Sequence, residues 1–195
     1  MDNKIDEEFW DLHWQTGQTG WDIGYPSPAI IDFVDKNINK SSSILIPGCG
    51  NAYEAEYLAK NDFQDITLID ISKTAVNNLK AKFKHYPNVK IIHSNFFQHN
   101  GQYDYIIEQT FFCALNPKLR NEYAKQMSKL LKSNGNLFGL LFKIEFEKEG
   151  PPFGGNESEY RMTFEPYFNI LSMEDCKSSI PKRIGNELFF KLGLK

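Results

Sequence analysis

Short apolar runs alternate with longer amphipathic stretches along most of this chain. Runs of this length, bounded by glycine and polar residues, are typical of buried strands. They predict strands over residues 43–50, 65–72, 89–94, 103–109, 136–143, 168–176 and 186–194. Helices are predicted between several of these strands, over residues 51–60, 73–84 and 116–131.

The helical stretches show their spacing clearly. Ala75, Val76, Leu79 and Phe83 fall on one face of the segment 73–84. The last helix has good start signals, because asparagine (Asn116) is a favoured N-cap and proline (Pro117) suits the first helical position. Its apolar face is formed by Leu119, Tyr123, Met127, Leu130 and Leu131. We expect Gly135 to stop this helix.

Five alternating strand–helix units predict an α/β fold, with a parallel sheet covered by helices on both faces. The linker between the last two strands, residues 177–185, is too short for a helical crossover, so these strands should form an antiparallel closing pair. At 195 residues, the chain suits one domain spanning 1–195. Ligands of such sheets bind at the carboxyl ends of the strands.

Composition narrows the function classes. The net charge of −3 and the lack of a basic stripe argue against a nucleic-acid partner. The chain has three widely spaced cysteines, and its four histidines do not combine with them in the spacing typical of metal ligands. Neither a disulfide framework nor a metal site is therefore expected. No signal-peptide pattern and no membrane-spanning run occurs. We expect a cytoplasmic monomer.

A glycine turn and an acidic residue follow the first two strands. Gly48-Cys49-Gly50 ends the first strand, and Asp70 ends the second. Glycines let a backbone approach a ligand closely, and an aspartate at this place can accept hydrogen bonds from ribose hydroxyls. The alternative is a turn kept for packing, followed by a helix-capping aspartate.

The turn also discriminates between nucleotides. The third glycine of a nicotinamide-dinucleotide fingerprint would stand at position 53, where this chain has Tyr53. A tyrosine there crowds a pyrophosphate, whereas S-adenosylmethionine has none. The antiparallel ending also favours a methyltransferase over a dehydrogenase.

Longer motifs carry a family resemblance. They are "FWDLHWQTGQTGWDIG", "IPGCGNAYEAEYLA", "LIDIS", "YDYIIEQTFFCALNPKLR", "GPPFGG" and "IPKRIGNE". With these, nearly the whole chain resembles the thiopurine S-methyltransferase superfamily, and it looks most similar to the plant-type halide/thiol methyltransferases. The resemblance implies the Rossmann-like fold of class I S-adenosylmethionine-dependent methyltransferases, with residues 1–30 as an N-terminal helical lid.

All three tryptophans, Trp10, Trp14 and Trp21, lie in the expected lid. Trp10 and Trp14 share a helix face, and indole faces attract cations such as a sulfonium. The alternative is that the rings only pin a helix to the core. The resemblance further implies cofactor contacts at Gly48, Asp70, Asn95, Phe96 and Glu108.

The acceptor side is expected to be apolar. Phe111, Phe112 and Phe153 are predicted to wall a small pocket, although core packing is the alternative for each. The resemblance implies that Arg120 lies by the acceptor, where it could attract an anion; a solvated helix arginine is the alternative. Lys182 and Arg183 are a second cationic candidate. We interpret Cys113 as a small core residue rather than a nucleophile.

Methyl transfer from a sulfonium to a soft nucleophile requires no general acid or strong base, so no catalytic residue is assigned. The expected function is methyl transfer from S-adenosylmethionine to a small thiol, bisulfide or halide. The alternatives are a thiopurine methyltransferase, a nicotinamide oxidoreductase and a non-catalytic S-adenosylmethionine-binding module.

Overall fold

The computed structural model describes residues 5–195, so the predicted lid of residues 1–30 begins outside the described range. Its centre is a seven-stranded sheet in the order β3-β2-β1-β4-β5-β7-β6. The strands are β1 Ser43–Pro47, β2 Asp65–Asp70, β3 Val89–His93, β4 Tyr103–Gln109, β5 Leu131–Phe142, β6 Phe168–Asp175 and β7 Glu187–Leu194. Strands β1 to β5 are parallel, and β7 runs antiparallel to β5 and β6, which confirms the predicted fold class.

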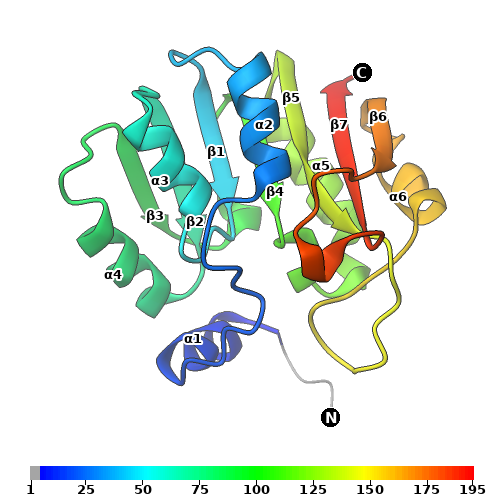
Figure 1. Cartoon of the computed structure of the whole chain (residues 1–195), viewed down its shortest axis with the longest axis horizontal. Coiled ribbons are helices and arrows are strands. Elements are labelled where there is room, and N and C mark those ends of the chain that lie inside the picture. Colours follow the sequence, from blue (N-terminus) through cyan, green and yellow to red (C-terminus); the bar gives the residue numbers. More distant parts are fainter. Residues whose placement is uncertain (1–4) are drawn as a thin grey trace.

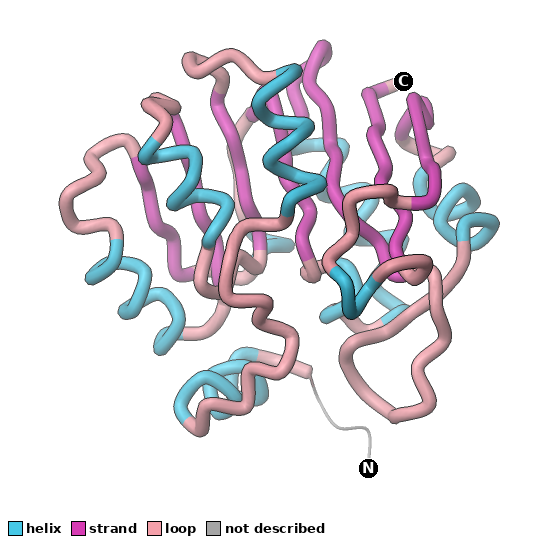
Figure 2. Tube along the Cα trace, in the orientation of Figure 1, coloured by secondary structure: helices cyan, strands magenta, loops and turns pink. Residues whose placement is uncertain are grey.

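Helices cover both faces of the sheet (Figures 1 and 2). The α-helices are α1 Glu7–Gln15, α2 Pro28–Asn37, α3 Tyr53–Lys60, α4 Lys73–Lys82, α5 Arg120–Leu130 and α6 Glu157–Phe164. The 3-10 turns are η1 Phe96–Gln98, η2 Phe112–Ala114, η3 Pro117–Leu119 and η4 Pro181–Arg183. Within β1, Ile44 and Ile46 pack with the α2–α4 side, and Leu45 packs with the α5–α6 side. This strand is buried on both faces and is therefore apolar from Ile44 to Pro47.

Three details differ from the sequence prediction. Strand β5 begins at Leu131 instead of residue 136, directly after helix α5 ends at Leu130, because Leu131 already pairs with Tyr103. Strands β3 and β4 are joined through η1 alone, so the strand–helix alternation is broken there. Helix α2 was not predicted; it buries Ile30 and Val34 against the sheet.

The chain reverses its direction of travel across the sheet between β1 and β4. Helix α1 and the long loop 143–156 both lie below the carboxyl ends of the strands (Figure 1). This is the edge at which open α/β sheets bind ligands. Among residues 5–195, no helix is long and apolar enough to cross a membrane.

Candidate functional site

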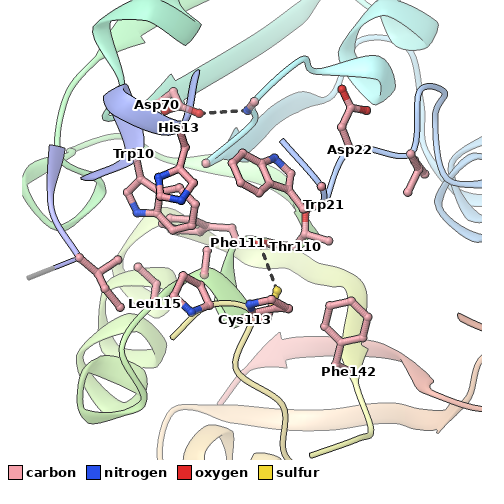
Figure 3. Close-up of a pocket in the computed structure, with 18 of the residues that line it drawn as sticks. Trp10, His13, Trp21, Asp22, Asp70, Thr110, Phe111, Cys113, Leu115 and Phe142 are labelled. Carbon is pink, nitrogen blue, oxygen red and sulfur yellow. Dashed lines mark hydrogen bonds between the residues drawn. The ribbon is translucent and has the colours of Figure 1, made fainter. Parts of the chain in front are cut away.

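A cavity of about 1160 Å³ opens at this edge. Its walls come from the N-terminal segment, the ends of β1 to β4, the loop after β5, and the η4 turn. In Figure 3, Trp10, His13 and Trp21 face Cys113 and Phe142 across the cavity. The structure therefore joins the N-terminal segment, the glycine turn and the η4 turn in one site.

The three tryptophans form one wall of this cavity. The Trp21 ring makes edge contacts with Trp10 and Trp14, with ring centres 5.4 Å and 6.0 Å away. Trp14 stands directly over the glycine turn, since a Cβ on Gly50 would lie 3.2 Å from its ring. The predicted sharing of one face by Trp10 and Trp14 is thus seen in the structure.

Carboxylates tie the tryptophan segment to the body of the protein. Asp11 accepts hydrogen bonds from the Ser72 hydroxyl and the Thr74 amide, each at 2.7 Å. The Thr74 hydrogen bond is the main reason that the pKa of Asp11 is lowered. Asp22 accepts hydrogen bonds from the side chains of Asn51 and Tyr53. Neither anchor was found by sequence reasoning, because no spacing signals a partner so distant in the chain.

Asp70 links the glycine turn to the end of β2. Its carboxylate accepts hydrogen bonds from the Gly50 amide at 3.0 Å and the Ser72 amide at 2.9 Å, and it lines the cavity. Burial raises the pKa of Asp70. Gly48 and Gly50 have φ values of +55° and +52°, which favour glycine.

Asn95 and Phe96 line the cavity where β3 ends. The Asn95 side chain accepts a hydrogen bond from the Phe97 amide at 3.0 Å and so caps η1. The Phe96 ring packs edge-on against Phe111, with ring centres 5.1 Å apart. Both residues therefore line the same cavity as Asp70.

Glu108 does not line the cavity; it is fully buried behind the loop that follows β4. Its carboxylate accepts hydrogen bonds from the amides of Phe111 and Phe112, at 2.7 and 2.9 Å, and from the Tyr123 hydroxyl. Burial raises the pKa of Glu108 to about 7. Glu108 was expected to contact the cofactor, but in the structure its carboxylate holds the backbone of the loop after β4.

Of the three predicted acceptor-side phenylalanines, only Phe111 lines the cavity. Its ring lies so close to the backbone that a Cβ on Gly48 would be 2.2 Å from the ring edge. Phe112 is 1% exposed and packs against Tyr123 and other core rings. The amide of Phe153 donates to the Cys113 carbonyl at 2.7 Å, so Phe153 supports the wall from outside.

Arg120 is also outside the cavity lining. Its guanidinium donates to the Gly154 carbonyl at 2.6 Å and lies over the Phe112 ring at 4.8 Å. It therefore joins α5 to the "GPPFGG" loop, and the prediction that it faces the acceptor is corrected. A residue on a helix can point to any side, and the sequence does not tell which.

Arg183, unlike Arg120, lines the cavity. Its side chain donates to the Trp21 carbonyl at 3.1 Å, pairs with the buried Glu187 at 3.2 Å, and lies over the Phe142 ring. The sequence analysis had named Arg183 only as a secondary candidate. Lys148 and Lys182 line the cavity as well.

Cys113 is a buried wall residue whose thiol donates to the Thr110 carbonyl at 3.3 Å. Burial raises its pKa, which disfavours the nucleophilic thiolate. Within residues 5–195, no group of histidine, cysteine and carboxylate side chains is arranged to hold a metal ion. The site thus offers apolar walls, one end rich in hydrogen-bonding groups, and a cationic rim.

Comparison with known proteins gives a consistent result. The family model for thiopurine S-methyltransferase matches residues 5–188. The chain is 36% identical over 190 residues to a "Probable thiol methyltransferase 2" of Arabidopsis thaliana, a match covering 94% of this chain and 82% of that protein. It is 31% identical over 199 residues to "Thiocyanate methyltransferase 1" of Brassica oleracea, covering 99% of this chain and 86% of that one.

Among solved structures, a Burkholderia thailandensis 1,6-didemethyltoxoflavin-N1-methyltransferase with bound S-adenosylhomocysteine superimposes with a TM-score of 0.78. The match covers 97% of this chain and 87% of that chain, at 14% sequence identity. At this level of identity, the likeness supports the fold.

Proposed function

Because the chain belongs to the thiopurine S-methyltransferase family, we propose that it transfers a methyl group to a small thiol, bisulfide or halide. Its cofactor is S-adenosylmethionine, and it is a methyltransferase. The observation that carries the choice of acceptor is the wall formed by Phe111, Cys113 and Phe142, with the cation of Arg183 beside it.

The residues at the hydrogen-bonding end of the cavity fit this cofactor. We propose that Asp70 accepts hydrogen bonds from ribose hydroxyls and that Asn95 and Phe96 hold the adenine, since all three line the cavity. The glycine turn supplies backbone without side chains in the way, and the three indole faces provide an environment that attracts a cation. When bound, the cofactor supplies a methyl group on a positively charged sulfur.

The protein's own contribution is positioning and exclusion of water. A small polarisable anion loses its water against the apolar walls, and Arg183 limits the cost of that loss. An acceptor that is already anionic needs no proton removed. This accounts for a site without a Ser/His/Asp or Cys/His constellation among the residues that line it.

A thiopurine remains the second candidate acceptor. A cavity of about 1160 Å³ exceeds the roughly 300–1,000 Å³ that ligand pockets usually measure, so its volume does not argue against a larger acceptor. A nicotinamide oxidoreductase and a non-catalytic binding module find no support in the comparisons. We also propose that the protein acts as a cytoplasmic monomer without nucleic-acid partners, in keeping with its net charge of −3.

Residues 8–24 are proposed to close over the cofactor as a lid. The segment is held by a few anchors, chiefly Asp11, Asp22 and the Arg183–Trp21 hydrogen bond, so it can open locally at modest cost. We expect its amides to exchange hydrogen at least tenfold more slowly when S-adenosylhomocysteine is bound. Mass spectrometry of exchanged peptides measures this, with α5 as the internal control. Equal protection in both states would make the tryptophans purely structural.

Arg183→Gln is expected to lower kcat/KM for iodide or bisulfide about 10- to 100-fold, the value of one hydrogen bond to a charged group. Affinity for S-adenosylhomocysteine should change much less, because Gln retains a donor for the Trp21 carbonyl. Arg120→Gln is the matched control: it should lower the melting temperature without changing acceptor preference, since Arg120 contacts the wall from outside. Equal losses of acceptor turnover in both variants would contradict the assignment.

A further inference from the structure

His13 lies on α1 and lines the cavity between two of the tryptophans. Its Nδ1 is 2.8 Å from the carbonyl oxygen of Phe9, one helical turn earlier. A carbonyl oxygen only accepts hydrogen bonds, so Nδ1 carries the hydrogen. In the neutral ring, the lone pair that can accept a proton is therefore on Nε2.

The ring orientation directs this lone pair away from the helix. Nδ1 faces the backbone of α1, and Nε2 is on the other side of the ring. The ring centre lies 6.0 Å from that of Trp10 and 6.1 Å from that of Trp21 (Figure 3). Within residues 5–195, no group forms a hydrogen bond with Nε2. His13 is partly exposed and lines the cavity.

The carboxylates on the cavity wall, in contrast, have structural roles. Asp6 accepts a hydrogen bond from the Phe9 amide and caps α1. Asp22 anchors the segment to Asn51, and Asp70 holds the Gly50 amide. Each of these oxygens already stabilises the fold around the cavity.

The remaining titratable groups on the wall are Cys113, Tyr25, Lys148, Lys182 and Arg183. Lysine and arginine side chains are hydrogen-bond donors without an acceptor atom. The pKa of Cys113 is raised by burial. Helix α4, which packs against α1, contributes no side chain to the cavity lining. Nε2 of His13 is thus the one uncommitted base among the described wall residues.

We propose that His13 Nε2 is the general base that accepts the proton of a neutral thiol acceptor, which extends the enzyme beyond acceptors that arrive as anions. This inference rests on the proposed function. The acceptor sulfur forms a bond to the methyl carbon with its own electron pair, and the bond from that carbon to the sulfonium breaks, with its pair passing to the cofactor sulfur. The thiol proton moves to Nε2 and is then released to water.

The need for such a base depends on the acceptor. Iodide and thiocyanate are anions at every assay pH, so they need no proton removed. An alkanethiol is almost entirely protonated at neutral pH and is a poor nucleophile in that form. A positioned general base contributes roughly 10²- to 10⁴-fold to such a step. His13 is therefore expected to affect one acceptor class and not the other.

The test is His13→Asn, because the asparagine amide can still donate to the Phe9 carbonyl while the base is removed. The full chain is assayed with labelled S-adenosylmethionine against ethanethiol and against iodide at the same pH. We expect kcat/KM for ethanethiol to fall by about 100-fold or more and kcat/KM for iodide to change less than threefold. His85→Asn, at an exposed position away from the cavity, is the matched control.

A second readout is independent of turnover. In the complex with S-adenosylhomocysteine, nuclear magnetic resonance follows the His13 ring, assigned by comparison with His13→Asn and His13→Gln. Ethanethiol should shift the ring signals to their protonated positions, and thiocyanate should not. Parallel losses with ethanethiol and iodide, or an unchanged ethanethiol rate, would overturn the proposal. If the wild type methylates neither acceptor, the proposed function fails, and an unprotonated ring with ethanethiol bound also overturns the role of His13.

Discussion

Gly48→Ala is expected to abolish measurable methyl transfer, a loss of at least about 1000-fold. Alanine at φ +55° costs about 1–2 kcal/mol in backbone strain. In addition, its Cβ would lie 2.2 Å from the Phe111 ring, which must leave its place on the cavity wall. Both the glycine turn and the acceptor wall are then displaced. Initial rates with saturating cofactor and the thermal unfolding midpoint measure the two consequences.

Gly185→Ala is a control that separates the cost of backbone strain from the cost of a steric clash. Gly185 has a φ of +80°, yet no atom lies within 4 Å of the position its Cβ would take. We expect this control to lose about 1–2 kcal/mol of stability while it retains methyl transfer. If both alanine variants lose activity equally, close packing of Phe111 on Gly48 does not shape the site.

Glu108→Gln is expected to become increasingly stable relative to the wild type as pH rises. The pKa of Glu108 is about 7 in the folded protein, against an ordinary value of 4.5. Below pH 4.5, both the folded and the unfolded states hold the proton. Between about pH 4.5 and 7, the folded state holds more protons than the unfolded state, so the wild type loses stability as pH rises. The relative change should be on the order of 3 kcal/mol and level off above pH 7.

The glutamine variant keeps the contacts needed for the comparison. Its carbonyl oxygen can accept from the Phe111 and Phe112 amides, and its amide can donate to the Tyr123 hydroxyl oxygen. Urea unfolding of both proteins across pH 4 to 8 measures the difference, and exposed Glu122→Gln controls for a general charge effect. A stability difference that is constant or falls with pH would show that burial does not raise the pKa of the Glu108 carboxyl.

Much of the fold could be predicted because periodicity reports burial directly. The apolar run at residues 43–47 is buried on both faces, as an inner parallel strand must be. The start of β5 could not be predicted this way, because residues 132–136 at its beginning are polar or glycine. Leu131 belongs to the strand because it pairs with Tyr103 on β4. That pairing joins residues distant in sequence, so no local pattern shows it.

The site was predicted unevenly for a similar reason. Asp70 lines the cavity because its place at the end of a strand sets its place at the sheet edge, and the tryptophans, which the resemblance assigned to a lid, line it as well. Glu108 was assigned to the cavity although strand alternation puts it on the face of Ile106, which packs towards α5. That signal was present in the sequence. The role of Arg183 depends on Glu187 and the Trp21 carbonyl, partners that no local pattern identifies.

The central claim is that this cavity methylates a small thiol or halide with S-adenosylmethionine. The most direct measurement is a competition assay in which the purified protein and labelled S-adenosylmethionine are given iodide, bisulfide and a thiopurine together. Headspace and solution products are then counted separately. We predict volatile labelled products from iodide and bisulfide, formed faster than the methylated thiopurine. A clear preference for the thiopurine would contradict the small-anion assignment, and no label in any product would contradict the claim as a whole.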